Sequence, residues 1–314
     1  MTTLQEPTVE SSEAFPEPGE ERETLRQRLA GFHFLAMERV ATSWPERAGR
    51  TLFDLYARSM HGAMPGLRAT VAANQSRVLG RPPDSDVVRA AVREAFRLYG
   101  RYWYDTFRLR VTPPEEINKR FVIDGLENID RALEAGRGAI AALPHMGNWD
   151  AAGHFMSVNG YRLAAVAEEL RPKAVFEQFL RHREALGMRV VPLTSSKNVG
   201  VELGQLLLDN WVVALVADRD LGGRGVDVEM FGATRKLPAG PALLSIKTGS
   251  PLLACLVHTT DEGWFCRIPE PLQIELTGDT RADVTALTRL LAQQFERAIA
   301  AKPVDWHMFQ PAWP

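Results

Sequence analysis

The stretch that decides the fold is ALPHMGNWD, at residues 142–150. An apolar run at residues 138–144 is typical of a buried strand, and the residues from Asn148 onward are typical of a helix with Asn148 as its N-cap. His145 is therefore expected at the carboxyl end of a strand, directly before a helix. In open α/β sheets ligands bind outside these strand ends, and a helix start offers backbone N–H donors and a positive dipole end.

His145 and Asp150 are residue types that suit general-base catalysis. We expect the Asp150 carboxylate to reach back to the imidazole, fix its tautomer and stabilise imidazolium, which leaves the other ring nitrogen free to take a proton from a hydroxyl group. Spacing alone is weak evidence, because a chain with seven histidines supplies such a pair by chance about a third of the time. The position between a strand and a helix removes most chance matches.

The composition is that of an ordinary globular protein. The 314 residues are 45% hydrophobic and 24% charged, and a net charge of −2 gives no reason to expect nucleic acid as a partner. The chain shows neither a signal pattern nor an apolar run of the roughly 20 residues that span a bilayer. It is therefore expected to be cytosolic, with a membrane-surface role left open. Cys255 and Cys266 are expected to be reduced core thiols in adjacent strands, with a disulfide as the alternative.

The pattern along the chain predicts an α/β fold with an added helical layer. Residues 1–23 are predicted to be a disordered acidic tail, and residues 24–110 about four helices, separated by proline and glycine. Strands then alternate with helices over residues 115–314, which predicts a mixed central β-sheet flanked by helices on both faces. Residues 24–314 are expected to form a single domain. The predicted strands are residues 121–124, 139–143, 163–167, 189–192, 212–216, 226–231, 234–237, 251–257 and 264–268.

Charged residues follow two further predicted strands. Asp218, Arg219 and Asp220 come after the strand at residues 212–216, so we expect them near His145 at the same sheet edge. For Arg219 and Asp220 two interpretations stay open: they bind a polar acceptor or an anionic co-substrate, or an internal Arg–Asp ion pair supports the loop. Glu168 follows the strand at residues 163–167, and Arg183 lies on the next predicted helix.

Several common chemistries lack their sequence patterns. The chain has no GxSxG elbow and no phosphate-binding P-loop, and the glycines at residues 136–138 precede their strand, whereas a dinucleotide site needs them after it. A metal-dependent hydrolase would need a further pair of ligands at helix spacing, so we expect no metal. With no evident nucleophile, the pattern favours direct attack by an acceptor hydroxyl on a reactive acyl group such as a thioester.

Four stretches, residues 143–150, 217–221, 237–241 and 305–311, resemble the His-x-x-x-x-Asp acyltransferases. Most of residues 25–314 is covered, and the chain is most similar to the lipid A late acyltransferase branch, within it to the phosphatidylinositol mannoside acyltransferases. The resemblance implies that His145 is the base and Asp150 its partner. Those enzymes carry Glu-Arg-Asp at residues 218–220, and the shorter Asp218 is implied in the hydrogen-bond network around His145 or the sugar. The implied substrate-binding residues are Glu168, Arg183, Arg219 and Asp220.

The same resemblance implies a substrate pair and a location. A fatty acyl group, expected to be palmitoyl, moves from acyl-CoA, as co-substrate and without a cofactor, to a mannose hydroxyl of a phosphatidylinositol mannoside, at the cytoplasmic face of the cell membrane. The alternatives are an acyltransferase for another glycolipid or a lysophospholipid, and a catalytically silent lipid-binding protein. Basic and aromatic side chains of the N-terminal helices are candidates for membrane docking or, equally, for the core. They are Phe32, Phe34, Leu35, Trp44, Phe53, Leu55 and Tyr56, beside Arg47, Arg50 and Arg58.

Overall fold

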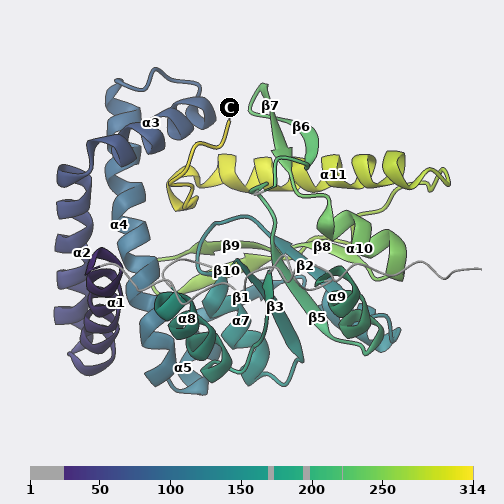
Figure 1. Cartoon of the computed structure of the whole chain (residues 1–314), viewed down its shortest axis with the longest axis horizontal. Helices are drawn as coiled ribbons and strands as arrows, with labels where there is room; N and C mark the ends of the chain where they lie inside the picture. Colours follow the sequence, from purple (N-terminus) through teal and green to yellow (C-terminus); the bar gives the residue numbers. More distant parts are fainter. Residues whose placement is uncertain (1–24, 169–172, 194–198, 221, 314) are drawn as a thin grey trace, which may run out of the picture.

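A computed structural model describes residues 25–168, 173–193, 199–220 and 222–313 (Figure 1). The predicted acidic tail lies outside the described residues. Four N-terminal helices follow, as predicted, and Figure 1 shows them as a layer beside the sheets. Their limits follow from capping: Pro65 opens one helix, Gly80 ends it in a left-handed conformation, and the Ser85 side chain accepts a hydrogen bond from the Val88 N–H at the start of the last. The helices are α1 (Leu25–Ser43), α2 (Glu46–Ala63), α3 (Pro65–Leu79) and α4 (Asp86–Arg108).

A five-stranded sheet forms the centre of the α/β region, and all of its neighbouring strands pair in parallel. Its order is β4-β3-β5-β2-β8, which places the carboxyl ends of β3, β5 and β2 side by side. The strands are β2 (Ala139–Leu143), β3 (Leu163–Glu168), β4 (Arg189–Leu193), β5 (Val212–Val216) and β8 (Leu252–Ala254). The helices that connect them are α7 (Trp149–Val158), α8 (Lys173–Ala185), α9 (Val199–Leu208) and α10 (Gly240–Thr248).

The strand predicted at residues 251–257 is two strands, because the chain passes from one sheet to another at Cys255. The Cys255 N–H still donates to Ala142 O of β2, but the residues after it form β9 (Leu256–Thr259), which pairs with β10 (Trp264–Arg267). β1 (Phe121–Asp124) completes this second, mixed sheet by pairing in parallel with β10. The predicted α/β class is confirmed, but the central sheet is parallel and not mixed, and the mixed strand directions occur in this smaller sheet.

The remaining elements pack around the two sheets. A hairpin of β6 (Val226–Met230) and β7 (Ala233–Leu237) packs against the long helix α11 (Thr280–Ala301). Helix α5 (Pro114–Arg120), which the sequence analysis did not predict, and α6 (Glu127–Glu134) lie close to β1 and β2 respectively. Short 3₁₀ turns occupy Leu109–Val111 and Pro303–Asp305. Within the described residues, no helix is long and apolar enough to cross a membrane.

The core divides at the central sheet because side chains alternate along a strand. Ile140 and Ala142 of β2 face one buried cluster with α9, α10 and α11, while the other three residues of β2 face a second with α5, α6 and α7. Helices thus cover both faces, as predicted. Cys255 and Cys266 belong to the second cluster as free, buried thiols, which confirms the expectation, and burial raises the pKa of Cys255 to about 12.

Candidate active site

The loop after β2 holds His145 at the carboxyl edge of the central sheet. The Asn148 side chain accepts a hydrogen bond from the Ala151 N–H at 2.8 Å, so the predicted N-cap is confirmed. Gly147 has a φ of +63°, and a Cβ there would lie 2.7 Å from the Val257 carbonyl, so only glycine fits. The His145 side chain is about one-fifth exposed (21%) and lines a large cavity.

Asp218 is the carboxylate that binds the His145 ring. One of its oxygens contacts Nδ1, and the other accepts hydrogen bonds from the His145 backbone N–H at 3.0 Å and from Trp306 Nε1 at 2.8 Å. Burial alone would raise the pKa of Asp218, but the charge of His145 and the hydrogen bonds from His145 and Trp306 outweigh it and lower the pKa to about 2. Because an ionised carboxylate only accepts hydrogen bonds, Nδ1 carries the proton and Nε2 is left as the basic nitrogen.

Asp150 does not orient His145, so the predicted contact between them is wrong. Its buried carboxylate accepts hydrogen bonds from Tyr102 Oη at 2.8 Å and from Arg183 Nε and Nη2 at 2.6 and 3.4 Å. Burial raises the pKa of Asp150, but the Arg183 guanidinium more than compensates, and the net effect lowers it. Asp150 therefore fixes Arg183, which itself lines the cavity beside His145.

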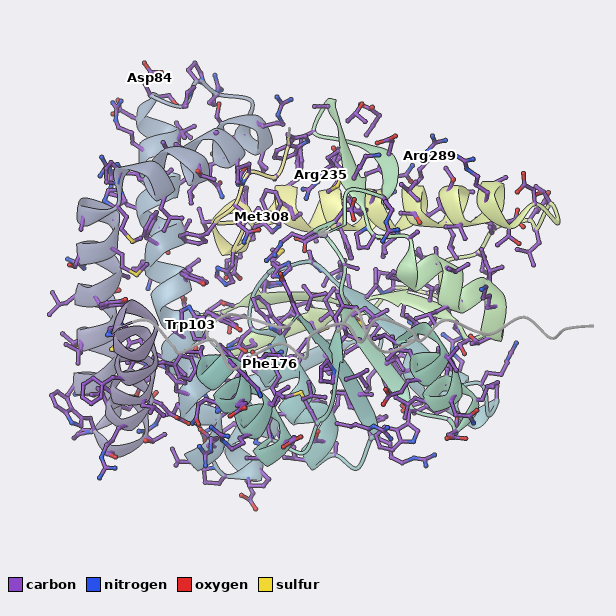
Figure 2. The ribbon with its side chains drawn as sticks, viewed as in Figure 1. Asp84, Trp103, Phe176, Arg235, Arg289 and Met308 are labelled. Atoms are coloured by element: carbon purple, nitrogen blue, oxygen red, sulfur yellow. The ribbon has the colours of Figure 1, made fainter. Side chains whose placement is uncertain are left out.

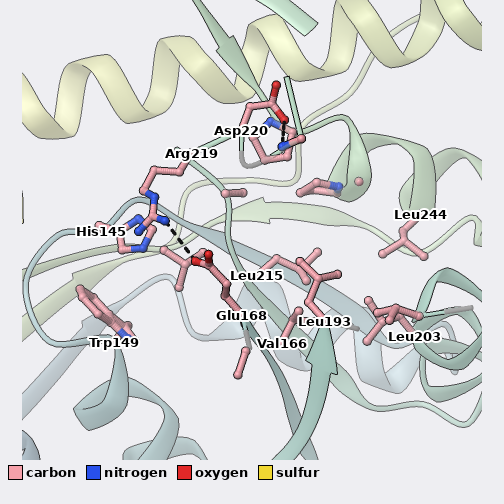
Figure 3. Close-up of a pocket in the computed structure, with 18 of the residues that line it drawn as sticks. His145, Trp149, Val166, Glu168, Leu193, Leu203, Leu215, Arg219, Asp220 and Leu244 are labelled. Atoms are coloured by element: carbon pink, nitrogen blue, oxygen red, sulfur yellow. Dashed lines mark hydrogen bonds and ion pairs between the residues drawn. The ribbon is translucent and has the colours of Figure 1, made fainter. Parts of the chain in front are cut away.

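The other predicted polar residues also meet at this cavity (Figure 3). Arg219 pairs with Glu168 at 3.1 Å, so its ion pair is with the neighbouring strand end and not with Asp220. Asp220 accepts hydrogen bonds from the N–H groups of Gly222 and Gly225 and thereby shapes the glycine loop. The structure thus brings His145, Glu168, Arg183, Arg219 and Asp220 around one space.

That space is a cavity of about 940 Å³ with a polar end and an apolar arm. The aromatic side chains of Tyr99 and Trp149 line the cavity together with His145, and the Trp149 ring centre lies 5.4 Å from that of His145. Trp103, from α4, and Phe176, from α8, also line it (Figure 2). The arm runs toward α9 and α10 (Figure 3). Its wall includes Val166, Leu193, Leu203, Leu215 and Leu244. This shape suits an amphiphile with a reactive head and a long apolar chain.

The segment after α11 supplies contacts that sequence reasoning did not assign. The Gly147 N–H donates to Asp305 O at 3.1 Å and the His307 N–H donates to His145 O at 2.7 Å, while Trp306 binds Asp218. Burial lowers the pKa of His307 to about 4, which keeps its ring neutral at neutral pH. The resemblance singled out residues 305–311, but nothing local in that stretch indicates which side chain reaches His145 or Asp218.

A histidine bound to a buried carboxylate at the end of a parallel strand, and open to a long apolar cavity, defines a site that can activate a hydroxyl group beside a lipid chain. Residues 19–314 match the family model described as bacterial lipid A biosynthesis acyltransferase. The chain belongs to this family and is an acyltransferase.

Similar proteins include two phosphatidylinositol mannoside acyltransferases. The one from Mycobacterium tuberculosis is 38% identical over 303 residues, which cover 94% of this chain and 92% of the relative. The one from Mycolicibacterium smegmatis is 37% identical over 290 residues, or 92% of this chain and 93% of the relative. A solved 1-acyl-sn-glycerophosphate acyltransferase from Thermotoga maritima aligns with a TM-score of 0.34 and 16% identity over 80% of this chain and 96% of that chain.

Proposed function

We propose that the protein transfers a fatty acyl group, expected to be palmitoyl, from acyl-CoA to a mannose hydroxyl of a phosphatidylinositol mannoside, with His145 as general base. The observation that carries this proposal is the His145 ring, bound at Nδ1 by the ionised Asp218 and facing a cavity large enough for an acyl chain. The family match supports acyl transfer, and the two similar mannoside acyltransferases support the acceptor.

In the proposed reaction the acceptor hydroxyl gives its proton to His145 Nε2 while its oxygen attacks the thioester carbonyl. The C–S bond of the resulting tetrahedral intermediate then breaks, and the imidazolium returns the proton to the departing CoA thiolate. Asp218 stabilises the imidazolium between these steps.

The developing oxyanion needs a hydrogen-bond donor, and a missing donor typically costs about 3 kcal/mol in the barrier. The Gly147 N–H is already used by Asp305 O, which removes it from the candidates. Arg183 lines the cavity with its side chain held by Asp150, so we assign it this role before Arg219, whose guanidinium is paired with Glu168.

The two ends of the cavity suit the two substrates. The apolar arm would bury the acyl chain, at about 0.8 kcal/mol for each methylene removed from water. The rim pair of Glu168 and Arg219 offers an acceptor and several donors for sugar hydroxyls. Because the Glu168 side chain is 44% exposed, it can exchange its partner for a substrate hydroxyl.

We place the protein peripherally at the cytoplasmic face of the membrane, with α1 and α2 toward the lipid. Of the seven candidate aromatic and aliphatic residues, Phe53 is buried and Phe34 packs against Phe107 and Phe179, so these two belong to the core. The other five side chains are exposed, up to 73% for Phe32. They are Phe32, Leu35, Trp44, Leu55 and Tyr56. Co-sedimentation with anionic liposomes tests this placement, and loss of binding is expected on replacing Phe32 and Leu35 by serine.

The decisive experiment follows radiolabelled palmitate from palmitoyl-CoA to purified phosphatidylinositol mannosides, with wild type and His145→Ala side by side. Labelled mannoside that disappears with the variant supports the acceptor and the base. Slow thioester hydrolysis that depends on His145, without labelled mannoside, keeps the base and points to another glycolipid or a lysophospholipid. Loss of both activities favours a silent lipid-binding protein.

A further inference from the structure

Arg235 lies where the hairpin pattern calls for an apolar side chain. Along β7 buried and exposed residues alternate, and Arg235 occupies a buried position with only 4% of its surface exposed. Burying a guanidinium costs several kcal/mol unless it is paired. Among the described residues, Arg235 has no carboxylate within ion-pair distance, and its Nε and Nη1 make no hydrogen bond. Its charge therefore needs an explanation other than stability.

The hydrogen bond of Arg235 and one of its two ring contacts lead to Asp218. Its Nη2 donates to the backbone carbonyl of Asp218 at 2.5 Å. Its guanidinium carbon lies 5.6 Å from the centre of the Trp306 ring and 5.2 Å from that of Trp313, within cation–π range. The Trp306 ring in turn donates its N–H to the Asp218 carboxylate. In Figure 2 Arg235 and Met308 lie beside α11.

We propose that Arg235 is a positioning residue of the acyl-transfer reaction, which fixes the backbone of Asp218 and uses its buried positive charge to favour the carboxylate that orients His145. The catalytic part of this inference rests on the proposed function. Arg235 does not line the cavity, so it acts through Asp218 and not on either substrate.

The electrostatic surroundings of Asp218 are simple enough to test. Within the part of the chain that the structure describes, the charged or titratable groups that face it are His145, which follows β2, and Arg235, from β7. His307 lies beyond the Gly147 carbonyl and acts on His145 only at longer range. Removing the Arg235 charge therefore raises the pKa of Asp218, which still stays ionised at neutral pH, and takes a positive charge away from the His145–Asp218 pair as a whole.

The test compares Arg235→Met and Arg235→Lys with a control, Arg77→Met. Arg77 is an exposed residue of α3 whose guanidinium carbon lies 5.3 Å from the Trp313 ring, without a contact to Asp218. We expect Arg235→Met to lower kcat about tenfold or more, the size of one charge-assisted hydrogen bond, with both KM values unchanged within about twofold. The acid limb of its kcat/KM profile should move to higher pH by roughly half a unit.

Arg235→Lys separates charge from geometry. Lysine keeps the positive charge, so the acid limb should stay at its wild-type position while kcat recovers only in part. Arg77→Met should change neither quantity. If Arg235→Met does not fold, the lysine variant decides: a displaced acid limb or a wild-type kcat would overturn the proposal.

A measurement without substrate keeps this inference distinct from the proposed function. The ¹⁵N shifts of the His145 ring, assigned by comparison with His145→Gln, report which nitrogen carries the proton. We expect a protonated Nδ1 in wild type and a mixed population in Arg235→Met, whatever the acceptor is. An unchanged tautomer with a kcat within twofold of wild type, or a fall in kcat matched by the same fall in the control, would overturn the proposal.

Discussion

Replacing Asp218 by asparagine should reverse the tautomer of His145. One Asp218 oxygen faces two N–H donors, from the His145 backbone and Trp306, and the other faces His145 Nδ1. An amide has a single oxygen, which satisfies the two donors only if the NH₂ group turns toward Nδ1. Nδ1 must then be the acceptor, and Nε2 carries the proton that a base must lack.

The expected loss in kcat is about 10³- to 10⁴-fold, the scale seen when an orienting carboxylate is neutralised without a change of shape, or about 4 to 5.5 kcal/mol in the barrier. Asp150→Asn serves as the matched control, because Asp150 is an equally buried carboxylate that binds Arg183 and Tyr102 instead. We expect kcat of the control to fall by about 10- to 100-fold, because Arg183 is held less firmly and stabilises the oxyanion less well, an effect of roughly one hydrogen-bond donor.

The assay is palmitoyl-CoA consumption under saturating acceptor, with thermal unfolding to verify that both variants fold. Asp218→Asn that keeps more than a tenth of the wild-type kcat, or that loses less than Asp150→Asn, would refute the reasoning. The first result would mean that a group other than Asp218 orients His145. The second would mean that Asp150 contributes more to catalysis than Asp218 does.

Three further outcomes are expected. Gly204→Leu should shorten the preferred acyl chain in kcat/KM measurements, because a Cβ at this cavity position would make an ordinary 3.8 Å contact with Thr248 Cγ2 and the remaining leucine atoms would extend into the arm. The pKa of Asp218, lowered from 3.8 to about 2, contributes about 2 kcal/mol of stability above pH 4 that is lost as the pH falls toward 2, so urea unfolding over this range should show a shallower pH dependence in Asp218→Asn. Cys255 and Cys266 are buried thiols with raised pKa values, so a thiol reagent should modify them only upon unfolding.

The sequence carries the elements of the site but not its pairing. Local periodicity predicts β2 and β5 at their observed limits, and Asp218 follows β5 by two residues just as His145 follows β2. The parallel register joins Leu143 to Val216, so the residues two positions beyond each strand end meet. The register of β2 and β5 is set by tertiary pairing and cannot be read from local sequence. Without it, Asp150, the carboxylate nearest to His145 in the chain, is wrongly chosen as the group that orients the His145 ring.

Long-range contacts also explain what else could not be predicted. The break at Cys255 depends on β9 finding β10 instead of staying beside β2. Arg235 and Trp306 reach Asp218 from segments that are 17 and 88 residues away in the chain. The composition of those segments does not indicate that both contact Asp218, because the sequence alone does not distinguish a buried arginine from an exposed one.

The site depends on residues 305–307, near the end of the chain, to hold the His145 loop in place, so it is complete only when these residues have folded against that loop. These contacts span about 160 residues of chain, as in the bond between His307 and the Gly147 carbonyl, and such contacts form late because the entropy of closing the loop is lost before they are made. A partly folded chain that lacks them has no Trp306 on Asp218 and no fixed His145 loop. We therefore expect acyltransferase activity to return during refolding only after residues 305–307 have bound the His145 loop.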